Sequence, residues 1–202
     1  MTLGVKYRDD IHGELDELRF SLSRAFSLRQ ELYRRRLNSR PAGCVRADHP
    51  IPPNRKFYFE VKIISVKQAS LRFRIFRNVA IGFSHSNSTL DGLPGYRETK
   101  SWGYNGDDGK LYSTGAAVPG VRCDTFGEVG DVVGCCIDPT DGTAFFTKNG
   151  ERQDGLIRGI HGKIFPLVYI MGGVEVRAYF PAQKASFLFD INTVSGGECF
   201  TP

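Results

Sequence analysis

No apolar run in this chain of 202 residues is long enough to cross a membrane, and no signal peptide is recognisable at its N-terminus. A spanning helix needs about twenty apolar residues, so the sequence predicts no transmembrane segment and no membrane contact. The five cysteines include no C-x-x-C pair, and their odd number leaves one over. This argues against a disulfide scaffold, and we interpret the cysteines as reduced thiols of an intracellular protein. The expected location is the cytoplasm, with the nucleus as the second candidate.

The sequence also lacks the motifs of common catalytic sites, since it contains no G-x-S-x-G, P-loop or H-E-x-x-H pattern. Its four histidines adjoin no cysteine or serine motif and are scattered: His12, His49, His85 and His161. Asp107 and Asp108 lack calcium-loop spacing, and neighbouring carboxylates on one turn rarely face each other across a cleft. Such a pair either caps backbone amides in a turn or contacts a basic residue of a partner. We expect no enzyme, no metal site and no cofactor.

What the sequence does contain is typical of a β-rich domain. Aromatic residues make up 12% of it, and 23 glycines and 10 prolines favour short strands joined by tight turns. The length suits one domain of about 150 residues with an appendage. We predict an N-terminal arm over residues 1–40, a main domain over 41–192 and a C-terminal tail over 193–202.

The net charge of +5 is concentrated near the N-terminus. A single acid, Glu31, accompanies seven arginines between positions 19 and 40: Arg19, Arg24, Arg29, Arg34, Arg35, Arg36 and Arg40. The remainder is close to charge balance, so a basic face on the main domain is not expected and nucleic acid is a disfavoured partner.

Residues 9–37 have the pattern of one helix. Apolar residues fall on one face at a spacing of three to four, with charged residues opposite: Leu15, Leu18, Leu22, Ala25 and Leu32. Asp9 or Asp10 is suited to cap the start of this helix. The arm either packs its apolar stripe on the main domain, forms a short coiled coil or serves as a basic targeting segment.

From residue 41 onward the pattern is that of antiparallel strands. Residues 57–66 alternate between apolar and polar positions, and residues 79–84 form a short apolar strand. Asp141-Gly142 and Asn149-Gly150 are hairpin signals on either side of the strand at 143–148. We predict a further hairpin at Gly172-Gly173, between Leu167–Ile170 and Val174–Phe180.

This succession of strands and tight turns predicts an all-β fold, a twisted antiparallel β-sandwich with a helical N-terminal arm. The segment Lys67–Asn78 does not fit, because it replaces a tight turn with twelve residues that carry four bases and no acid. It is either a genuine hairpin extension or an error of the gene model.

An ordered set of short motifs resembles the SPRY domain, nearest to that of the RanBPM-type Ran-binding scaffold proteins. The resemblance covers residues 45–191 and rests on VRADHPIP (Val45–Pro52), FYFEVKI (Phe57–Ile63), IGFS (Ile81–Ser84), LPGY (Leu93–Tyr96), GYNGDDG (Gly103–Gly109), GDVVGCC (Gly130–Cys136), FFTKNG (Phe145–Gly150) and FLFDI (Phe187–Ile191). Family members usually have an extra strand ahead of the first motif, where this chain has the arginine-rich segment. An uncovered sheet edge would follow from its loss.

The resemblance implies a non-catalytic adaptor that captures short linear segments of other proteins, as a scaffold or substrate adaptor in ubiquitin-dependent turnover or signalling. It also implies a binding rim, where the loop before Ser101-Trp102-Gly103 meets a late turn. The residues carried over to that rim are His49, His85, Leu93, Gly95, Tyr96, Met171 and Gly172. Tyr96 and Met171 occupy turn positions that large apolar side chains usually avoid, so they either bind partners or close the end of the sandwich.

Two alternatives remain open at this point. The arginine-rich arm and residues 67–78 could bind nucleic acid or another acidic surface, with the steep salt dependence of phosphate contacts. The chain could also be a secreted effector from which the signal has been removed. No residue in the sequence argues for contact with Ran itself, and the oligomeric state stays undetermined.

Overall fold

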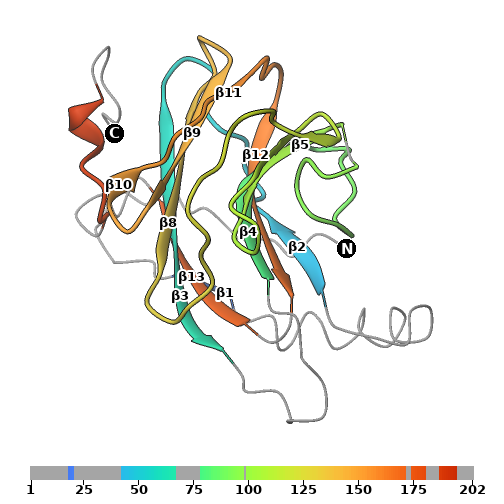
Figure 1. Cartoon of the computed structure of the whole chain (residues 1–202). Coiled ribbons are helices and arrows are strands. Elements are labelled where there is room, and N and C mark those ends of the chain that lie inside the picture. The colour runs from blue at the N-terminus through green and yellow to red at the C-terminus, as the bar shows by residue number, and fades with distance from the viewer. Residues whose placement is uncertain are drawn as a thin grey trace.

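The computed structural model describes residues 18–20, 42–66, 78–97, 99–171, 174–180 and 187–194. In this part of the chain two antiparallel β-sheets lie face to face, as the two layers of Figure 1 show. The predicted antiparallel β-sandwich is therefore confirmed. No helix among these residues is long and apolar enough to span a membrane.

The first sheet, sheet A, has seven strands in the order β1-β13-β3-β8-β9-β10, with β11 also paired to β9. Its strands are β1 (Leu18–Phe20), β3 (Phe57–Val66), β8 (Val132–Asp138), β9 (Thr143–Lys148), β10 (Glu151–Arg152), β11 (Ile157–Arg158) and β13 (Val174–Tyr179). The second, sheet B, has six strands in the order β2-β12-β4-β5-β6-β7. These are β2 (Ala42–Arg46), β4 (Asn78–His85), β5 (Ser101–Asn105), β6 (Leu111–Ser113), β7 (Ala116–Ala117) and β12 (Ile164–Met171).

The main core lies between the two sheets and follows from the alternation of each strand. On β3, Phe59, Val61 and Ile63 are fully buried, whereas Lys62 between the last two is exposed. Burying each such side chain contributes about 1.5–3 kcal/mol. Trp102, Tyr104 and Phe146 also belong to this cluster. Phe145 is buried as well, but it faces the other side of sheet A.

A second, smaller apolar cluster covers the outer face of sheet A. Its members are Tyr58, Cys136, Phe145, Phe189 and Ile191, and the last two come from the C-terminal strap, defined here as Phe187–Val194. The strap includes the 3-10 helix η2 (Ile191–Thr193), which lies beside sheet A in Figure 1. Cys135 belongs to the main core and its neighbour Cys136 to this cluster, because adjacent residues of a strand face opposite sides of the sheet. The four described cysteines form no disulfide with one another.

Turn predictions had different outcomes. Asp141-Gly142 joins β8 to β9 and Asn149-Gly150 joins β9 to β10, as expected. The hairpin predicted at Gly172-Gly173 is wrong, because β12 pairs with β2 and β4 in sheet B while β13 pairs with β1 and β3 in sheet A. Both edges of β12 are occupied, and its residues are buried on both faces as in a central strand. A pair of glycines suits a step between the sheets as well as a hairpin.

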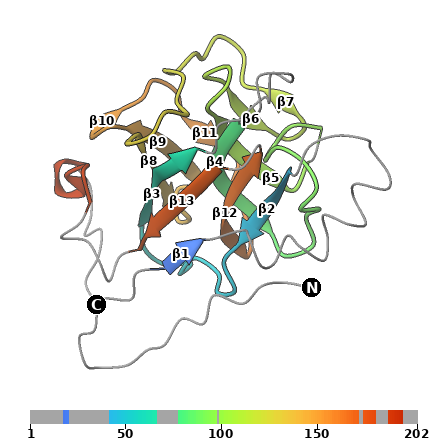
Figure 2. The ribbon, with the colours of Figure 1, turned by 90° about the horizontal axis from the view of Figure 1, so that it is seen from below.

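The helix predicted over residues 9–37 is wrong at Leu18–Phe20, which form strand β1. The backbone of β1 pairs with β13 at the margin of sheet A, where the two strands lie side by side in Figure 2. An unpaired strand edge has free N–H and C=O groups, and pairing with β1 satisfies those of β13. The rest of that predicted helix, and residues 67–77 of the basic segment, lie outside the described residues. The hairpin expected around that segment is wrong, because β3 belongs to sheet A and β4 to sheet B, so the two strands do not pair.

Candidate functional site

The loop between β4 and β5 lies directly on the outer face of sheet B. Its Leu90 carbonyl accepts a hydrogen bond from the Cys44 amide at 3.0 Å, and the Gly95 amide donates to Ser101 Oγ at 2.8 Å. Gly103 faces outward between two core residues, and a Cβ added there would lie 2.7 Å from Pro94 Cβ. The glycine therefore allows the loop to approach the strand closely.

Two left-handed turns hold each other at the end of this loop. The first contains Gly95 (φ 73°) and Arg97 (φ 55°), and the second contains Thr114 (φ 52°) and Gly115 (φ 92°). The Arg97 amide donates to the Gly115 carbonyl, and the Gly115 amide donates to the Gly95 carbonyl, both at 3.1 Å. A Cβ at Gly95 would lie 2.4 Å from the Tyr112 carbonyl oxygen, so only glycine fits this turn. These contacts fix the backbone on either side of Tyr96.

Tyr96 lies between these two hydrogen-bonded residues, Gly95 and Arg97, and its side chain points to the surface. Its side chain is 40% exposed, although most large apolar side chains of the described chain are buried. One side of the ring meets Tyr112 edge-to-face, with centroids 5.3 Å apart, and the Arg97 guanidinium carbon lies 5.1 Å from its centroid. Tyr96 is therefore supported by two neighbours and still presents surface to solvent.

The support continues into a polar network beneath Tyr112. The Tyr112 hydroxyl donates to Asp108 Oδ2 at 2.7 Å, and Asn105 Nδ2 donates to Asp108 Oδ1 at 2.8 Å. Burial alone would raise the pKa of Asp108, but hydrogen bonds from Tyr112, the Lys110 amide and Asn105, with the Lys110 charge, lower it below its usual value. Burial, and then the Asp108 carboxylate, raise the pKa of Tyr112 to about 12. The capping role predicted for this aspartate pair is confirmed for Asp108.

Met171 ends β12 on the same outer face of sheet B. Its neighbour Ile170 points into the core, and the half-buried Met171 accepts a hydrogen bond on Sδ from the Tyr169 hydroxyl at 3.6 Å. Tyr96 packs on Tyr112 of β6, which is three strands away from Met171 of β12 across sheet B. Along the strand direction the two residues are offset by four residues. The strand spacings give about 14 Å and the register about 13 Å, so the separation is about 19 Å.

The other predicted rim residues are divided between two ends of the sheet. Leu93 is half-buried in the loop that carries Gly95 and Tyr96, so the structure brings these three together. His49 is exposed in the segment after β2, and His85 ends β4, where its ring meets Trp102 edge-to-face at 5.3 Å. His85 and Met171 lie at opposite ends of the β4–β12 pair, about 23 Å apart along the strands. Gly172 lies outside the described residues.

Sequence reasoning missed Arg97 and Tyr112, the two residues that flank the Tyr96 ring. Arg97 follows the LPGY motif directly, yet a left-handed arginine has no sequence signal, since this backbone conformation is typical of glycine and asparagine. Tyr112 lies sixteen residues beyond Tyr96, and only the pairing of β6 with β5 brings it under the loop.

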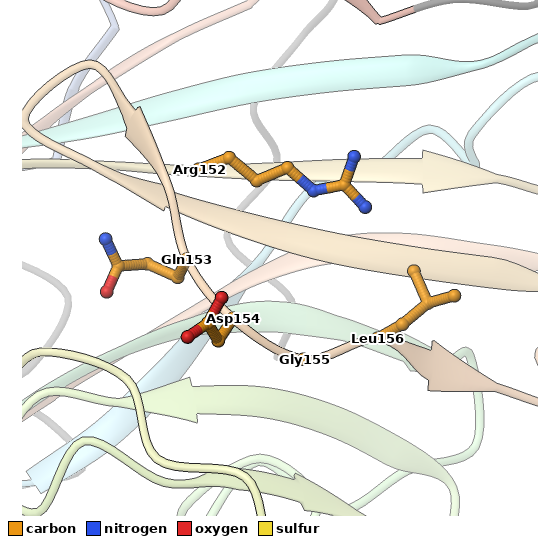
Figure 3. A pocket seen from close by; sticks show the side chains of 5 residues that line it. All are labelled: Arg152, Gln153, Asp154, Gly155 and Leu156. Carbon is orange, nitrogen blue, oxygen red and sulfur yellow. The ribbon is translucent and has the colours of Figure 1, made fainter.

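A separate hollow of about 320 Å³ lies on the sheet A side, within the loop from Arg152 to Leu156. In Figure 3 the Arg152 side chain extends toward the side where Leu156 lies, and Gln153 points away. The Arg152 guanidinium lies 4.2 Å from the centroid of the Phe145 ring. Among the described residues, no group of three or more His, Cys, Asp or Glu side chains is arranged to hold a metal ion.

The structure combines a two-layer antiparallel sandwich with an exposed aromatic side chain on a loop whose backbone is held by hydrogen bonds. This arrangement is typical of a β-sandwich interaction module. The family model of the SPRY domain matches residues 56–183, more than half of the chain, and the protein belongs to this family. SPRY domains are protein-interaction modules, so membership supports protein binding as the general function. A solved human SPRY domain is 33% identical, with a TM-score of 0.55 over 70% of this chain and 86% of that one.

The curated relatives place the chain near one subfamily. Ran-binding protein 9 of Xenopus laevis is 38% identical over 156 residues, which are 76% of this chain and 26% of that protein. Ran-binding protein 10 of Danio rerio is 36% identical over 157 residues, 76% of this chain and 24% of that protein. The resemblance to the RanBPM-type subfamily is therefore confirmed. The chain spans about a quarter of the length of these relatives.

Proposed function

We propose that this protein captures short segments of partner proteins on the outer face of sheet B, through a rim formed by Leu93, Gly95, Tyr96 and Met171. The observation that carries the proposal is the exposure of Tyr96 on a backbone held by two interlocked turns. Tyrosine is enriched among the residues that dominate binding energy at interfaces. A rim already ordered before binding loses little conformational entropy when a partner arrives.

The geometry limits what can bind. Met171 lies about 19 Å from Tyr112, on which Tyr96 packs, so a segment that reached from Tyr96 to Met171 would need roughly six residues of extended chain. Between these two apolar anchors Ala80 and Asn105, which lie opposite each other on β4 and β5, are buried and offer a ligand almost no surface. The expected ligand is therefore an extended peptide with apolar residues near both of its ends.

The relatives suggest the cellular setting. Their names record Ran-binding proteins, and by resemblance we propose that this chain acts as a scaffold or substrate adaptor in ubiquitin-dependent turnover or signalling. A cytoplasmic or nuclear location is part of the same proposal.

Affinity purification from the native cell type tests this function, with the wild type compared to a Tyr96→Ala, Met171→Asp double variant. Val129→Asp is the matched control, because Val129 is 60% exposed and lies in the loop before β8, away from the rim. Partners lost from the double variant but retained by the control would support the rim, provided that thermal unfolding shows all three proteins folded. An identical set of partners from all three would overturn it.

A further inference from the structure

Arg97 combines two features that its local fold does not require. Its φ of 55° is a conformation that non-glycine residues adopt at an energetic cost, although a glycine would meet no such penalty there. Its side chain is exposed, and its guanidinium lies over the ring of the residue that displays the rim. Backbone strain that persists in a well-supported loop is a reason to look for a role of the side chain.

The charge of the Arg97 guanidinium is not neutralised by an ion pair within the described part of the chain. Among the described residues no carboxylate forms an ion pair with it, whereas Lys110, on the same side of the sheet, pairs with Asp108 at 3.7 Å. The ring of Tyr96 restricts the position of the guanidinium, since the cation and the negative face of the ring attract each other. The planar edge of the guanidinium therefore keeps its donors available for a ligand.

A carboxylate is the group that matches this edge best, because it can accept two parallel hydrogen bonds from one guanidinium. The exposed part of the Tyr96 ring offers an apolar surface immediately beside it. Resting on the proposed function, we infer that Tyr96 and Arg97 act as a pair that selects partner segments in which an acidic residue adjoins an apolar one. The rim would thereby discriminate among peptides by charge as well as by apolar contact.

Selection from a random peptide library displayed on phage tests this inference without a known partner. The immobilised proteins are the full chain as wild type, Tyr96→Ala, Arg97→Glu and, as the charge-matched control, Arg158→Glu, whose arginine is exposed on β11 of sheet A. Peptides selected by the wild type and the control should share an aspartate or glutamate beside an apolar residue. Those selected by Arg97→Glu should carry lysine or arginine at that position.

Synthetic peptides then measure how strongly the acidic residue contributes to affinity. Replacing the acidic residue of a selected peptide by lysine should weaken binding to the wild type about 10- to 100-fold, and Arg97→Glu should recover binding of that lysine peptide. Selection that depends on Tyr96 but shows no acidic preference would overturn this inference and leave the proposed function standing. Peptides that bind Tyr96→Ala as well as the wild type would overturn both.

Discussion

At the scale of single residues, the exposed position of Tyr96 depends on the backbone conformations of its two neighbours. Gly95 permits the chain to lie against the Tyr112 carbonyl, and Arg97 accepts a left-handed conformation that ends the turn. The Tyr112 ring then supports Tyr96 from below, and Asp108 fixes the Tyr112 hydroxyl. The display of one aromatic side chain thus rests on a short series of contacts, each of which can be removed separately.

The contact at Gly95 can be separated from simple backbone strain. Gly95 and Gly120 have nearly the same φ, 73° and 72°, but a Cβ at Gly120 would meet nothing within 4 Å. We expect Gly120→Ala to lower the free energy of unfolding by about 1 kcal/mol, the cost of left-handed backbone alone. Gly95→Ala should lose a further 1–3 kcal/mol, roughly, because the methyl group meets the Tyr112 backbone. Urea unfolding of the two variants measures the difference, and equal losses would show that the loop is not held against β6.

The charge of Asp108 gives a prediction about pH. Its pKa is lowered in the folded protein, so its ionised form contributes stability above the ordinary value of 3.8, and this contribution is lost as pH falls through the folded pKa. At pH 7 Asp108→Asn should be less stable than the wild type by about 1–2 kcal/mol, with solvent screening limiting the loss. Urea unfolding between pH 7 and pH 3 should show that difference shrinking in acid. A difference independent of pH would contradict the role of the charge.

At the scale of elements, the C-terminal strap shows how a buried acid can hold a segment in place. Glu60 is 1% exposed on the outer face of β3 and accepts hydrogen bonds from the Leu188 and Phe189 amides at 2.9–3.0 Å. The Tyr58 hydroxyl donates to the same carboxylate at 2.8 Å. Three donors satisfy one buried carboxylate, and the strap covers the aromatic residues around it.

Removal of this carboxylate should release the strap. Glu60→Ala leaves the Leu188 and Phe189 amides without an acceptor, and the Tyr58 hydroxyl keeps only its hydrogen bond with Thr147 Oγ1. The free energy of unfolding should therefore fall by about 2–4 kcal/mol. Hydrogen exchange of the Leu188 and Phe189 amides should become faster than in Glu151→Ala, a control at an exposed glutamate on β10. Unchanged exchange at both amides would mean that other contacts hold the strap.

The strands themselves differ in how far the sequence predicts them. The bounds of β3 match those predicted from the alternation of apolar and polar residues, and the Asp141-Gly142 pair correctly predicted the β8–β9 turn. Both predictions succeeded because each depends only on residues that are close in sequence. The partners of β12 and β13 were missed, since pairing across sheets depends on which edges remain free rather than on the connecting glycines. The strand at Leu18–Phe20 was missed for the same reason. Pairing with the edge of β13 determines its conformation, whereas the sequence has a helical pattern there.

The same limit applies to the candidate site. LPGY and the late turn drew attention to Tyr96 and Met171 because large apolar residues at turns are unusual. Arg97 could not be found in this way, since its backbone conformation and its position over the Tyr96 ring exist only in the folded loop. The sequence also could not show that His49 and His85 lie near the end of β4 that is far from Met171, because this position depends on strand register.

At the scale of the whole molecule, the sandwich serves as a rigid base for the loop on its outer face. Two sheets bury one large core between them, and the outer face of sheet B carries the rim without contributing to that core. Specificity is therefore expected to reside in loop residues such as Tyr96 and Arg97.

The central claim is that Tyr96 supplies binding energy to a partner segment. Its most direct test is calorimetric measurement of the Kd of one captured partner for the wild type, Tyr96→Ala and Val129→Ala. We predict that Tyr96→Ala raises the Kd about 5- to 150-fold, equivalent to about 1–3 kcal/mol, while Val129→Ala leaves it unchanged. The same Kd for all three folded proteins would contradict the assignment of this rim as the binding surface.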